Sequence, residues 1–467
     1  MTISAKPISG FKEFLPEEQM LFNRMMDVIR RHYELFGFAP LETAAVERND
    51  VLLAKADEEN RKVMYGLHIL NSANPALVEN VKNYSLHFDQ TVPLARYVAQ
   101  NYGKLHFPFR RYQIQKVWRG ERPQGGRFRE FYQCDIDVIG DESLGLLHDA
   151  EMPAVIYGIF SELGIGKFII RLGNRKIHNG LLEDLGIPLH YNVKRSIAPG
   201  PDWDGEIVED TKNTLTLIDK MYKDGIEETR RAFHDDVGIP EERIDELLSF
   251  LSHKDDVHAT LKWLAAQNRN DMFALGVSEL TEVIDHMQAL GIPSNCYGID
   301  FGITRGLDYY TGTVYETTLV NHEAVGSVCS GGRFDDLAST FIDRKLPGVG
   351  ISIGLTRLFD ALQRSGAICT GAHCPTKAVI FNMTPSLRHE YFAMATALRA
   401  AGIPTEVYLE DKNINKQTKY AVNKQIPFGI FMDEKRQNRG VCTVRNYSNG
   451  DEAEVSLTQL KHHLHQL

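Results

Sequence analysis

Apolar residues recur with a helical period in two segments of the N-terminal third of the chain. From Glu17 to Phe36 they return every three or four positions and leave the arginines on the opposite side, which predicts a long amphipathic helix that ends at Gly37. Asp149 to Leu163 is predicted to be a second helix, bounded by Gly164. The segment between these two helices has a different period.

A strand pattern runs from Phe107 to Gly140. Arg111 to Glu121 and Phe128 to Ile139 are strand-like, and Arg122 to Gly126 has the composition of a turn, so we predict an antiparallel hairpin. Successive side chains of a strand point to opposite faces, so polar residues of equal parity share a face. These are Gln113, Gln115, Arg119 and Glu121 on the first strand, and Arg129, Gln133, Asp135 and Asp137 on the second. Such a face either is exposed to water or lines a polar cleft.

A charge-rich, helical stretch follows, from about Asp202 to Leu290. We interpret it as an insertion over residues 195–295 with its own small core, because strand-like segments resume at Tyr297 and run past Phe334. The segments on both sides of the insertion would then form one antiparallel-sheet domain over residues 1–368.

The last quarter of the chain has a different organisation. After a linker at 370–375, strand patterns alternate with helix patterns, which predicts a small α/β domain over residues 376–467. Expected strands cover 379–381, 405–409, 428–432 and 441–445, and expected helices cover 387–400, 413–424 and the residues from Ser456. The fold class is therefore α+β, an antiparallel-sheet domain with a helical insertion followed by an α/β domain.

Composition and charge narrow the class of protein. Of 467 residues, 43% are hydrophobic and 24% charged, as in globular chains, and no stretch approaches the ~18 consecutive apolar residues of a membrane span. Met1 to Phe14 lack the apolar region of a secretion signal, and the six cysteines lack paired spacing, so we expect a reducing, cytoplasmic location. With a net charge of −10, any contact with nucleic acid must come from local basic patches.

The turn of the hairpin is cationic. Arg122, Arg127 and Arg129 flank its two glycines, beside Arg119 at the end of the first strand. Guanidinium groups bind phosphate oxygens in pairs and stabilise charge that grows on phosphorus in a transition state. A solvated sheet face would be the better explanation of a hairpin without such a loop, but the cationic loop favours a polyphosphate ligand.

A second candidate element is Gly348 to Leu358. Bulky residues alternate with Gly348, Gly350, Ser352 and Gly354, so one strand face is nearly bare and could admit a flat ring. Arg357 follows at the start of an expected helix. Close packing between strands is the alternative explanation of the glycines.

Protein-bound metal is not expected. Cys369 and Cys374 lack the spacing of zinc ligands, and the terminal histidines His462, His463 and His465 are expected to be exposed to solvent. The chain also lacks the Gly-x-x-x-x-Gly-Lys-Ser/Thr loop of Walker-type nucleotide sites.

These elements resemble those of a known enzyme family. Phe109 to Pro123, continued by Arg129 to Asp135, looks like motif 2 of the class II aminoacyl-tRNA synthetases, and Gly348 to Leu358 looks like motif 3. Arg305 to Glu316 and Ser327 to Asp335 resemble the two signatures that are specific to histidyl-tRNA synthetases.

The resemblance extends over nearly the whole chain. Leu86 to Arg96 resembles the stretch that holds the amino group of the substrate, and the C-terminal domain is similar to the anticodon-binding domain of the family. It implies ligation of L-histidine to tRNA(His) by a homodimer. ATP, with Mg²⁺, would first give histidyl-adenylate and pyrophosphate, and a ribose hydroxyl of the tRNA would then attack the adenylate.

The resemblance also implies roles for individual residues. Asp89, Thr91 and Gln133 would hold the α-ammonium of histidine, and Asp137, Tyr309 and Tyr310 would bind its imidazole. Arg119 and Arg305 would be catalytic on either side of the α-phosphate, Glu121 would bind ATP, and Arg357 would contact adenine and the γ-phosphate. Contacts with tRNA are expected from Lys412, Lys416 and Lys419, which recur with Lys424 near helical spacing around Tyr420. A solvated helix face explains any single one of these lysines equally well.

Two residues depart from the family pattern. Ala44 stands where motif 1, the dimer-forming element, has a proline, and Gln90 replaces an apolar residue. We expect Gln90, on the strand face opposite Asp89, to take part in packing.

Two other functions are alternatives to that of a synthetase: a histidine-sensing regulatory paralogue and a non-catalytic RNA-binding module. The presence of Arg119, Arg305 and Arg357 disfavours both.

Overall fold

The computed structural model describes residues 3–54, 61–67, 83–123, 125–197, 206–304, 309–322, 325–369, 371 and 373–466. The chain forms two compact units, one of residues 1–12 and 26–368 and one of residues 13–25 and 369–467. Each unit has its own sheet and its own buried core.

The first unit is built on an eight-stranded sheet. Its strands, in spatial order, are β1 (Ala39–Pro40), β4 (Phe109–Trp118), β5 (Glu130–Ile139), β12 (Gly348–Gly354), β11 (Cys329–Phe334), β10 (Thr313–Leu319), β6 (Phe168–Asn174) and β9 (Tyr297–Ile299). Neighbouring strands are antiparallel except for β1 with β4 and β6 with β9. The predicted hairpin and antiparallel sheet are thus confirmed, although the first hairpin strand ends at Trp118, before Arg119 and Glu121.

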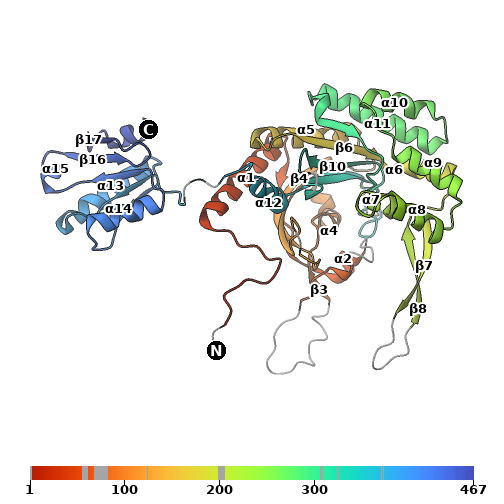
Figure 1. Ribbon diagram of the computed structural model, residues 1–467, viewed down its shortest axis with the longest axis horizontal. Coiled ribbons are helices and arrows are strands. Elements are labelled where there is room, and N and C mark those ends of the chain that lie inside the picture. Colours follow the sequence, from red (N-terminus) through yellow and green to blue (C-terminus); the bar gives the residue numbers. More distant parts are fainter. Residues whose placement is uncertain are drawn as a thin grey trace. The chain divides into compact units, whose positions relative to one another are not determined.

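Helices α1 (Pro16–Leu35) and α5 (Leu147–Leu163) match the two predicted helices closely. Hydrogen bonds tie them to the sheet: the Tyr33 hydroxyl donates to the carbonyl of Cys134, and the Tyr315 hydroxyl donates to that of Asp149. The end of α1 and the end of α5 lie side by side, with His32 Nε2 2.8 Å from Glu162 Oε2 (Figure 1). This sheet face is therefore closed by helices.

Helix α4 (Thr91–Asn101) closes one end of the opposite sheet face. Its Leu94 and Val98 belong to an apolar cluster with Ile139, Val314 and Phe334, all buried. Smaller elements between α1 and β4 are β2 (Val46–Arg48), α2 (Asn49–Leu53) and β3 (Tyr84–Leu86). The rest of this sheet face is polar.

The insertion begins with a two-stranded hairpin that the sequence did not reveal. Strands β7 (His190–Ile197) and β8 (Glu206–Asn213) precede the helices α7 (Leu215–Asp224), α8 (Ile226–Asp235), α9 (Glu241–Leu251), α10 (Val257–Ala266) and α11 (Asp271–Ala289) (Figure 1). Helix α11 crosses α6 (Arg175–Asp184) at two glycines: a Cβ on Gly276 would lie 2.7 Å from the Ile177 nitrogen, and one on Gly180 would lie 2.5 Å from the Phe273 nitrogen. These glycines allow the two backbones to touch.

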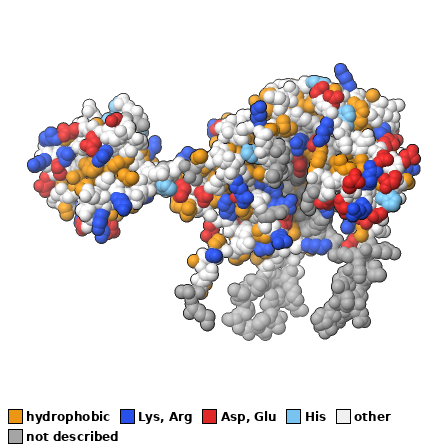
Figure 2. Space-filling model, viewed as in Figure 1, with side chains coloured by type: hydrophobic (Ala, Val, Ile, Leu, Met, Phe, Trp, Pro, Cys, Tyr) orange, Lys and Arg blue, Asp and Glu red, His pale blue; other side chains and the backbone are white. Residues whose placement is uncertain are grey.

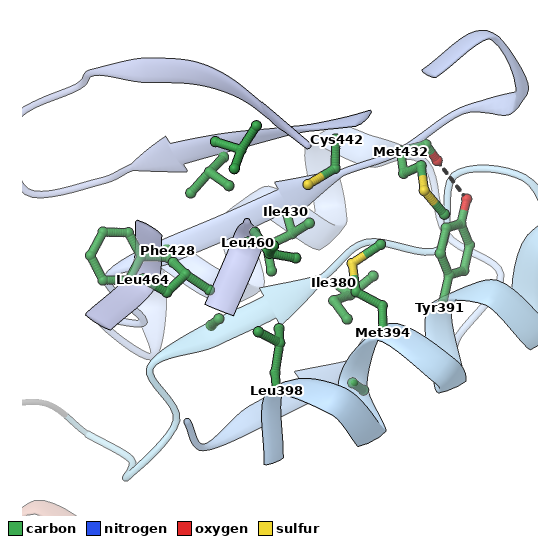
Figure 3. Packing of buried hydrophobic residues seen from close by; sticks show 14 of the residues in the cluster. Ile380, Tyr391, Met394, Leu398, Phe428, Ile430, Met432, Cys442, Leu460 and Leu464 are labelled. Carbon is green, nitrogen blue, oxygen red and sulfur yellow. Dashed lines mark hydrogen bonds between the residues drawn. The ribbon is translucent and has the colours of Figure 1, made fainter. Parts of the chain in front are cut away.

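The second unit contains a five-stranded sheet in the order β14 (Thr405–Val407), β13 (Ala378–Ile380), β15 (Phe428–Phe431), β16 (Val441–Asn446) and β17 (Glu452–Ser456). Its core packs α13 (Arg388–Ala400) against the sheet, and the buried Tyr391 hydroxyl donates to the Met432 carbonyl at 2.7 Å (Figure 3). One prediction was wrong here. Residues 452–456 pair with β16 as a strand, so the last helix, α16 (Leu460–Gln466), begins later than Ser456.

The surface of both units carries mixed charge. On the face drawn in Figure 2, acidic and basic side chains are interspersed, in keeping with the modest net charge of −10. None of the six cysteines, all of them among the described residues, forms a disulfide; Cys369 is exposed, Cys296 is partly exposed and the other four are buried. Across the described parts of the chain, the helices fall short of the length and apolar character that a bilayer crossing demands.

Candidate active site

The polar face of the large sheet forms the floor of a cavity of about 810 Å³. Cross-strand pairing explains why the floor is polar. Asp137 lies between Arg111 and Gly350, and Asp135 lies between Gln113 and Ser352. Directly paired residues share a face of the sheet, so residues of equal parity on β4, β5 and β12 meet on one surface. The alternative of a solvated sheet face is thus wrong for this hairpin, because Gln113, Asp135 and Asp137 are buried.

Every described residue that we predicted to bind histidine or ATP lines this cavity. They are Asp89, Thr91, Arg119, Glu121, Gln133, Asp137, Tyr309, Tyr310 and Arg357. Arg305 lies outside the described residues. Residues from distant parts of the chain therefore meet at one cavity.

Carboxylates gather at one end of the cavity. Asp89, Asp135 and Asp137 are all buried, and each has at least one oxygen that lacks a hydrogen-bond partner among the described residues. Burial raises the pKa of Asp89 to about 6 despite the opposing charge of Arg119, and it raises the pKa of Asp135 to about 7 despite that of Arg111. Burial also raises the pKa of Asp137. This end of the cavity is suited to a cation.

Asp135 should make stability depend on pH in a defined direction. Its pKa of about 7 in the folded protein lies above its ordinary value of 3.8, so the folded state binds the proton more tightly than the unfolded state does. The contribution of this carboxyl to stability therefore increases as the pH falls from about 7 towards 4. Asp135→Asn removes this contribution. We expect its free energy of unfolding, measured relative to that of the wild type, to be about 1 to 2 kcal/mol larger near pH 7.5 than near pH 5.5.

Chemical denaturation of both proteins at the two pH values measures this difference. A gap between variant and wild type that is the same at both values would contradict the raised pKa of Asp135.

Guanidinium groups form a second cluster in the cavity, the guanidinium end, which adjoins the carboxylates because the charge of Arg119 acts on Asp89. Arg119 Nε donates to the Phe88 carbonyl at 3.0 Å, and its Cζ lies 5.4 Å from the centre of the Phe131 ring. Arg357 donates to the carbonyls of Gly126 and Ser327, at 3.1 and 2.8 Å. Burial and the neighbouring positive charges of Arg127 and Arg119 lower the pKa of Arg357. Like charges held this close favour a polyanionic ligand.

Only part of the predicted cationic loop faces the cavity. Arg127 lines it and lies 3.5 Å from Glu121 in an ion pair. Arg129 is instead anchored, because its Nε donates to the Glu121 carbonyl and its Nη1 to that of Ser9. The prediction that the arginines of this loop face a polyphosphate ligand is therefore wrong for Arg129, and Arg122 is exposed and does not line the cavity.

The glycines of β12 serve different purposes. A Cβ on Gly348 would lie 2.4 Å from Phe334, and one on Gly350 would lie 2.0 Å from Asp137 Oδ1, so these two glycines make room for neighbouring side chains. A Cβ on Gly354 would make only ordinary contacts, at 3.8 Å, with Arg357 and the Val328 carbonyl oxygen. Packing therefore explains Gly348 and Gly350, while Gly350, Ser352 and Gly354 of the same strand face do line the cavity.

Sequence reasoning missed several residues of the site. Asp135 shares the parity of Asp137 but received no role, and Arg111 was omitted although it has the parity of Gln113. Tyr222 of α7 also lines the cavity, and its hydroxyl donates to Asp300 Oδ1 at 2.7 Å. Parity could have revealed the first two, whereas the sequence contains no signal for Tyr222.

Gln90 takes part in packing, as expected, but not on a strand. It is the N-cap residue of α4, is fully buried, and its Nε2 donates to the carbonyls of Gln115 and Gln133. It therefore ties the start of α4 to both strands of the hairpin.

The predicted tRNA-contacting lysines lie in the second unit. Lys412 precedes α14 (Ile414–Asn423), Lys416 and Lys419 belong to it, and all three are exposed. Tyr420 and Lys424 instead make contacts within the domain. The Tyr420 hydroxyl donates to Glu406 Oε2 at 2.7 Å, and Lys424 Nζ donates to Glu406 Oε1 at 2.8 Å.

Comparisons with known proteins agree with this arrangement. The family described as histidyl-tRNA synthetase matches residues 10–194 and 210–358, and the anticodon binding domain family matches residues 377–467. A histidine–tRNA ligase of Clostridium tetani is 42% identical over 454 residues, covering 97% of this chain and 96% of that protein. One of Stenotrophomonas maltophilia is 44% identical over 456 residues, covering 96% and 94%. A crystal structure of histidyl-tRNA synthetase from a Nostoc species is 37% identical, with a TM-score of 0.85 and 100% of both chains covered.

Proposed function

Because the chain belongs to the histidyl-tRNA synthetase family, and so attaches histidine to tRNA through an adenylate, we propose specific roles for the residues of its cavity. The observation that supports them is the division of one cavity into a carboxylate end and a guanidinium end. Histidine carries an ammonium group and an imidazole ring, and ATP carries a triphosphate. The two ends match the two substrates in charge.

At the carboxylate end, Asp89, Thr91 and Gln133 hold the α-ammonium group. Asp89 Oδ1 accepts from the Val92 backbone nitrogen at 3.3 Å, and Oδ2 has no hydrogen-bond partner in the described part of the chain, so it is available to the substrate. Gln133 Nε2 donates to the Ser352 hydroxyl at 2.6 Å, so its amide is oriented and its Oε1 faces the arginine end. An ammonium ion there would favour ionised Asp89.

Asp137, Tyr309 and Tyr310 bind the imidazole ring. Tyr310 lies over the strands, since a Cβ on Gly332 would come within 2.7 Å of its ring, and the two tyrosine rings are 4.6 Å apart. A carboxylate and phenol groups can satisfy both ring nitrogens. An amino acid without these nitrogens would leave buried polar groups unpaired, which is how such a site rejects competitors.

At the guanidinium end, Arg119 holds the α-phosphate, with Arg305 on its other side. Arg357 contacts adenine and the γ-phosphate, and Glu121 binds the nucleotide. The histidine carboxylate then attacks the α-phosphorus in line with the departing pyrophosphate. Positioning and electrostatic stabilisation supply the acceleration, so a dedicated general base is not required.

We propose that ATP enters with Mg²⁺. The described residues include no group of three His, Cys, Asp or Glu side chains that could hold a metal ion. Glu121 and Glu316 line the cavity close to Arg357 and are the candidate carboxylate ligands of the magnesium ion. This donor set fits an ion held mainly by the phosphates, where its charge would neutralise the β- and γ-phosphates.

The remaining proposals concern partners. Lys412, Lys416 and Lys419 would bind phosphates of tRNA(His), because they are exposed on one segment of the anticodon-binding domain.

A homodimer is supported by the apolar side chains of Val46 and Tyr84, which are 44% and 45% exposed on paired strands near Ala44. A cytoplasmic location agrees with six free cysteines.

ATP–pyrophosphate exchange with each of the twenty amino acids tests the function. We expect exchange with histidine alone, because only histidine provides both an ammonium group and an imidazole for the carboxylate end. Binding of histidine without any exchange would point instead to a regulatory paralogue that senses histidine. Exchange with another amino acid would contradict the roles of Asp137, Tyr309 and Tyr310.

A further inference from the structure

Arg111 lies behind the carboxylate end of the cavity and has no role in the scheme above. It belongs to β4, its side chain is fully buried, and it does not line the cavity, whereas its cross-strand partner Asp137 does. The Arg111 Nη2 atom lies 2.6 Å from Asp137 Oδ2. A guanidinium removed from water is costly unless it compensates a buried anion. Arg111 therefore acts on the cavity through Asp137 and not through contact with a ligand.

The positive charge of Arg111 acts on three buried carboxylates of the carboxylate end. Burial raises the pKa values of Asp89, Asp135 and Asp137, and the positive charge of Arg111 opposes the rise in each case. Asp89 Oδ2, Asp135 Oδ1 and Asp137 Oδ2 have no hydrogen-bond partner among the described residues, so Arg111 alone does not satisfy the cluster. Among the three carboxylates, only Asp137 is in an ion pair with Arg111.

The carboxylate of Asp137 is fixed from two directions. Gly350 lies against Oδ1, since a Cβ there would be 2.0 Å away, and Arg111 lies against Oδ2. Arg111 is itself held, because it donates to Gln113 Oε1 and to the Gln90 carbonyl, each at 3.4 Å. The orientation of Asp137 thus depends on β4 and on the residue that precedes α4.

We propose that Arg111 is a positioning residue for the amino-acid substrate, which holds Asp137 in the orientation that accepts an imidazole N–H and thereby contributes to selectivity for histidine. This inference rests on the proposed function, because Asp137 contacts the ring only if histidine occupies the carboxylate end. Loss of Arg111 should then affect KM for histidine and leave KM for ATP unchanged.

Arg111→Lys is the first variant to test. Lysine keeps the buried positive charge but lacks the planar fork that can contact Asp137, Gln113 and the Gln90 carbonyl together. In histidine-dependent pyrophosphate exchange we expect KM for histidine to rise about tenfold, with kcat at saturating histidine and KM for ATP within about twofold of the wild type. Arg111→Met also removes the charge and should raise KM further. Should it fail to fold, the lysine variant decides.

Arg110→Lys is the matched control. Arg110 is the neighbouring residue of β4, points to the opposite face and binds Glu151 through two nitrogens at 2.8 and 2.9 Å, away from the cavity. Its KM for histidine should equal that of the wild type. A wild-type KM in Arg111→Lys, or an equal rise in KM for histidine and ATP, would overturn the positioning role.

Calorimetric titration with histidine distinguishes failure of this inference from failure of the proposed function. A wild type that binds histidine and an Arg111→Lys variant that binds it equally well would overturn the inference alone. A wild type without affinity for histidine would overturn the proposed function, and the role of Arg111 with it.

Discussion

Arg119→Ala is expected to lower the kcat of histidine-dependent pyrophosphate exchange by about a hundredfold to a thousandfold, which is the usual cost of removing one fixed donor from a transition state. The guanidinium of Arg119 is fixed before any substrate binds, by the Phe88 carbonyl and the Phe131 ring. It also lowers the pKa of Asp89, so its loss should raise KM for histidine as well, because a protonated Asp89 binds an ammonium ion less well.

Lys116→Ala is a suitable control for this variant. Lys116 lies on β4, three residues before Arg119, pairs with Glu130 at 2.7 Å and does not line the cavity. A partly exposed ion pair of this kind contributes little to stability, so exchange should be unaffected. A kcat for Arg119→Ala within tenfold of that of the wild type would contradict the proposed contact between Arg119 and the α-phosphate.

Gly350→Ala should reduce kcat/KM for histidine by about a hundredfold. The new methyl group would lie 2.0 Å from Asp137 Oδ1 and 2.7 Å from the Ile136 carbonyl oxygen, so the carboxylate must move away from the ring-binding position. A lost hydrogen bond to a charged group costs about 1.5 to 3 kcal/mol, which corresponds to roughly ten- to a hundredfold in affinity, and the steric strain adds to this.

Gly298→Ala tests whether any glycine of the sheet would give this result. Gly298 lies in the edge strand β9, and no atom lies within 4 Å of a Cβ built there. Its kinetics should match those of the wild type. Equal losses of kcat/KM in both variants, or unchanged KM for histidine in Gly350→Ala, would contradict the fixed placement of Asp137.

The sequence predicted the polar floor of the cavity because strand parity can be read from one segment at a time. Gln113, Gln133 and Asp137 were assigned to common faces on this basis, and the antiparallel hairpin does place them together. Parity also places Arg111 on this face, but it does not identify the partner of Arg111. Only the register of β4 against β5 reveals that Arg111 faces Asp137.

Errors elsewhere have a similar origin. The strand at 452–456 is short and follows a turn, and only its pairing with β16 distinguishes it from the start of a helix. The bare face of β12 was inferred without knowing which side chains of β5 and β11 would fill it. Residues such as Tyr222 reach the cavity from an insertion more than eighty positions away from Gln133, a relation that no local pattern contains.

The cysteines differ in exposure, so one of them can be labelled selectively in the native enzyme. Cys369 is exposed and is the first residue of the C-terminal stretch of the second unit, whereas Cys134 and Cys329 are buried in strands of the large sheet. A maleimide dye added to the native protein would therefore attach first at Cys369 and leave the buried cysteines of the large sheet unmodified. Its fluorescence would report on the surroundings of Cys369 while tRNA is charged, without any engineered thiol.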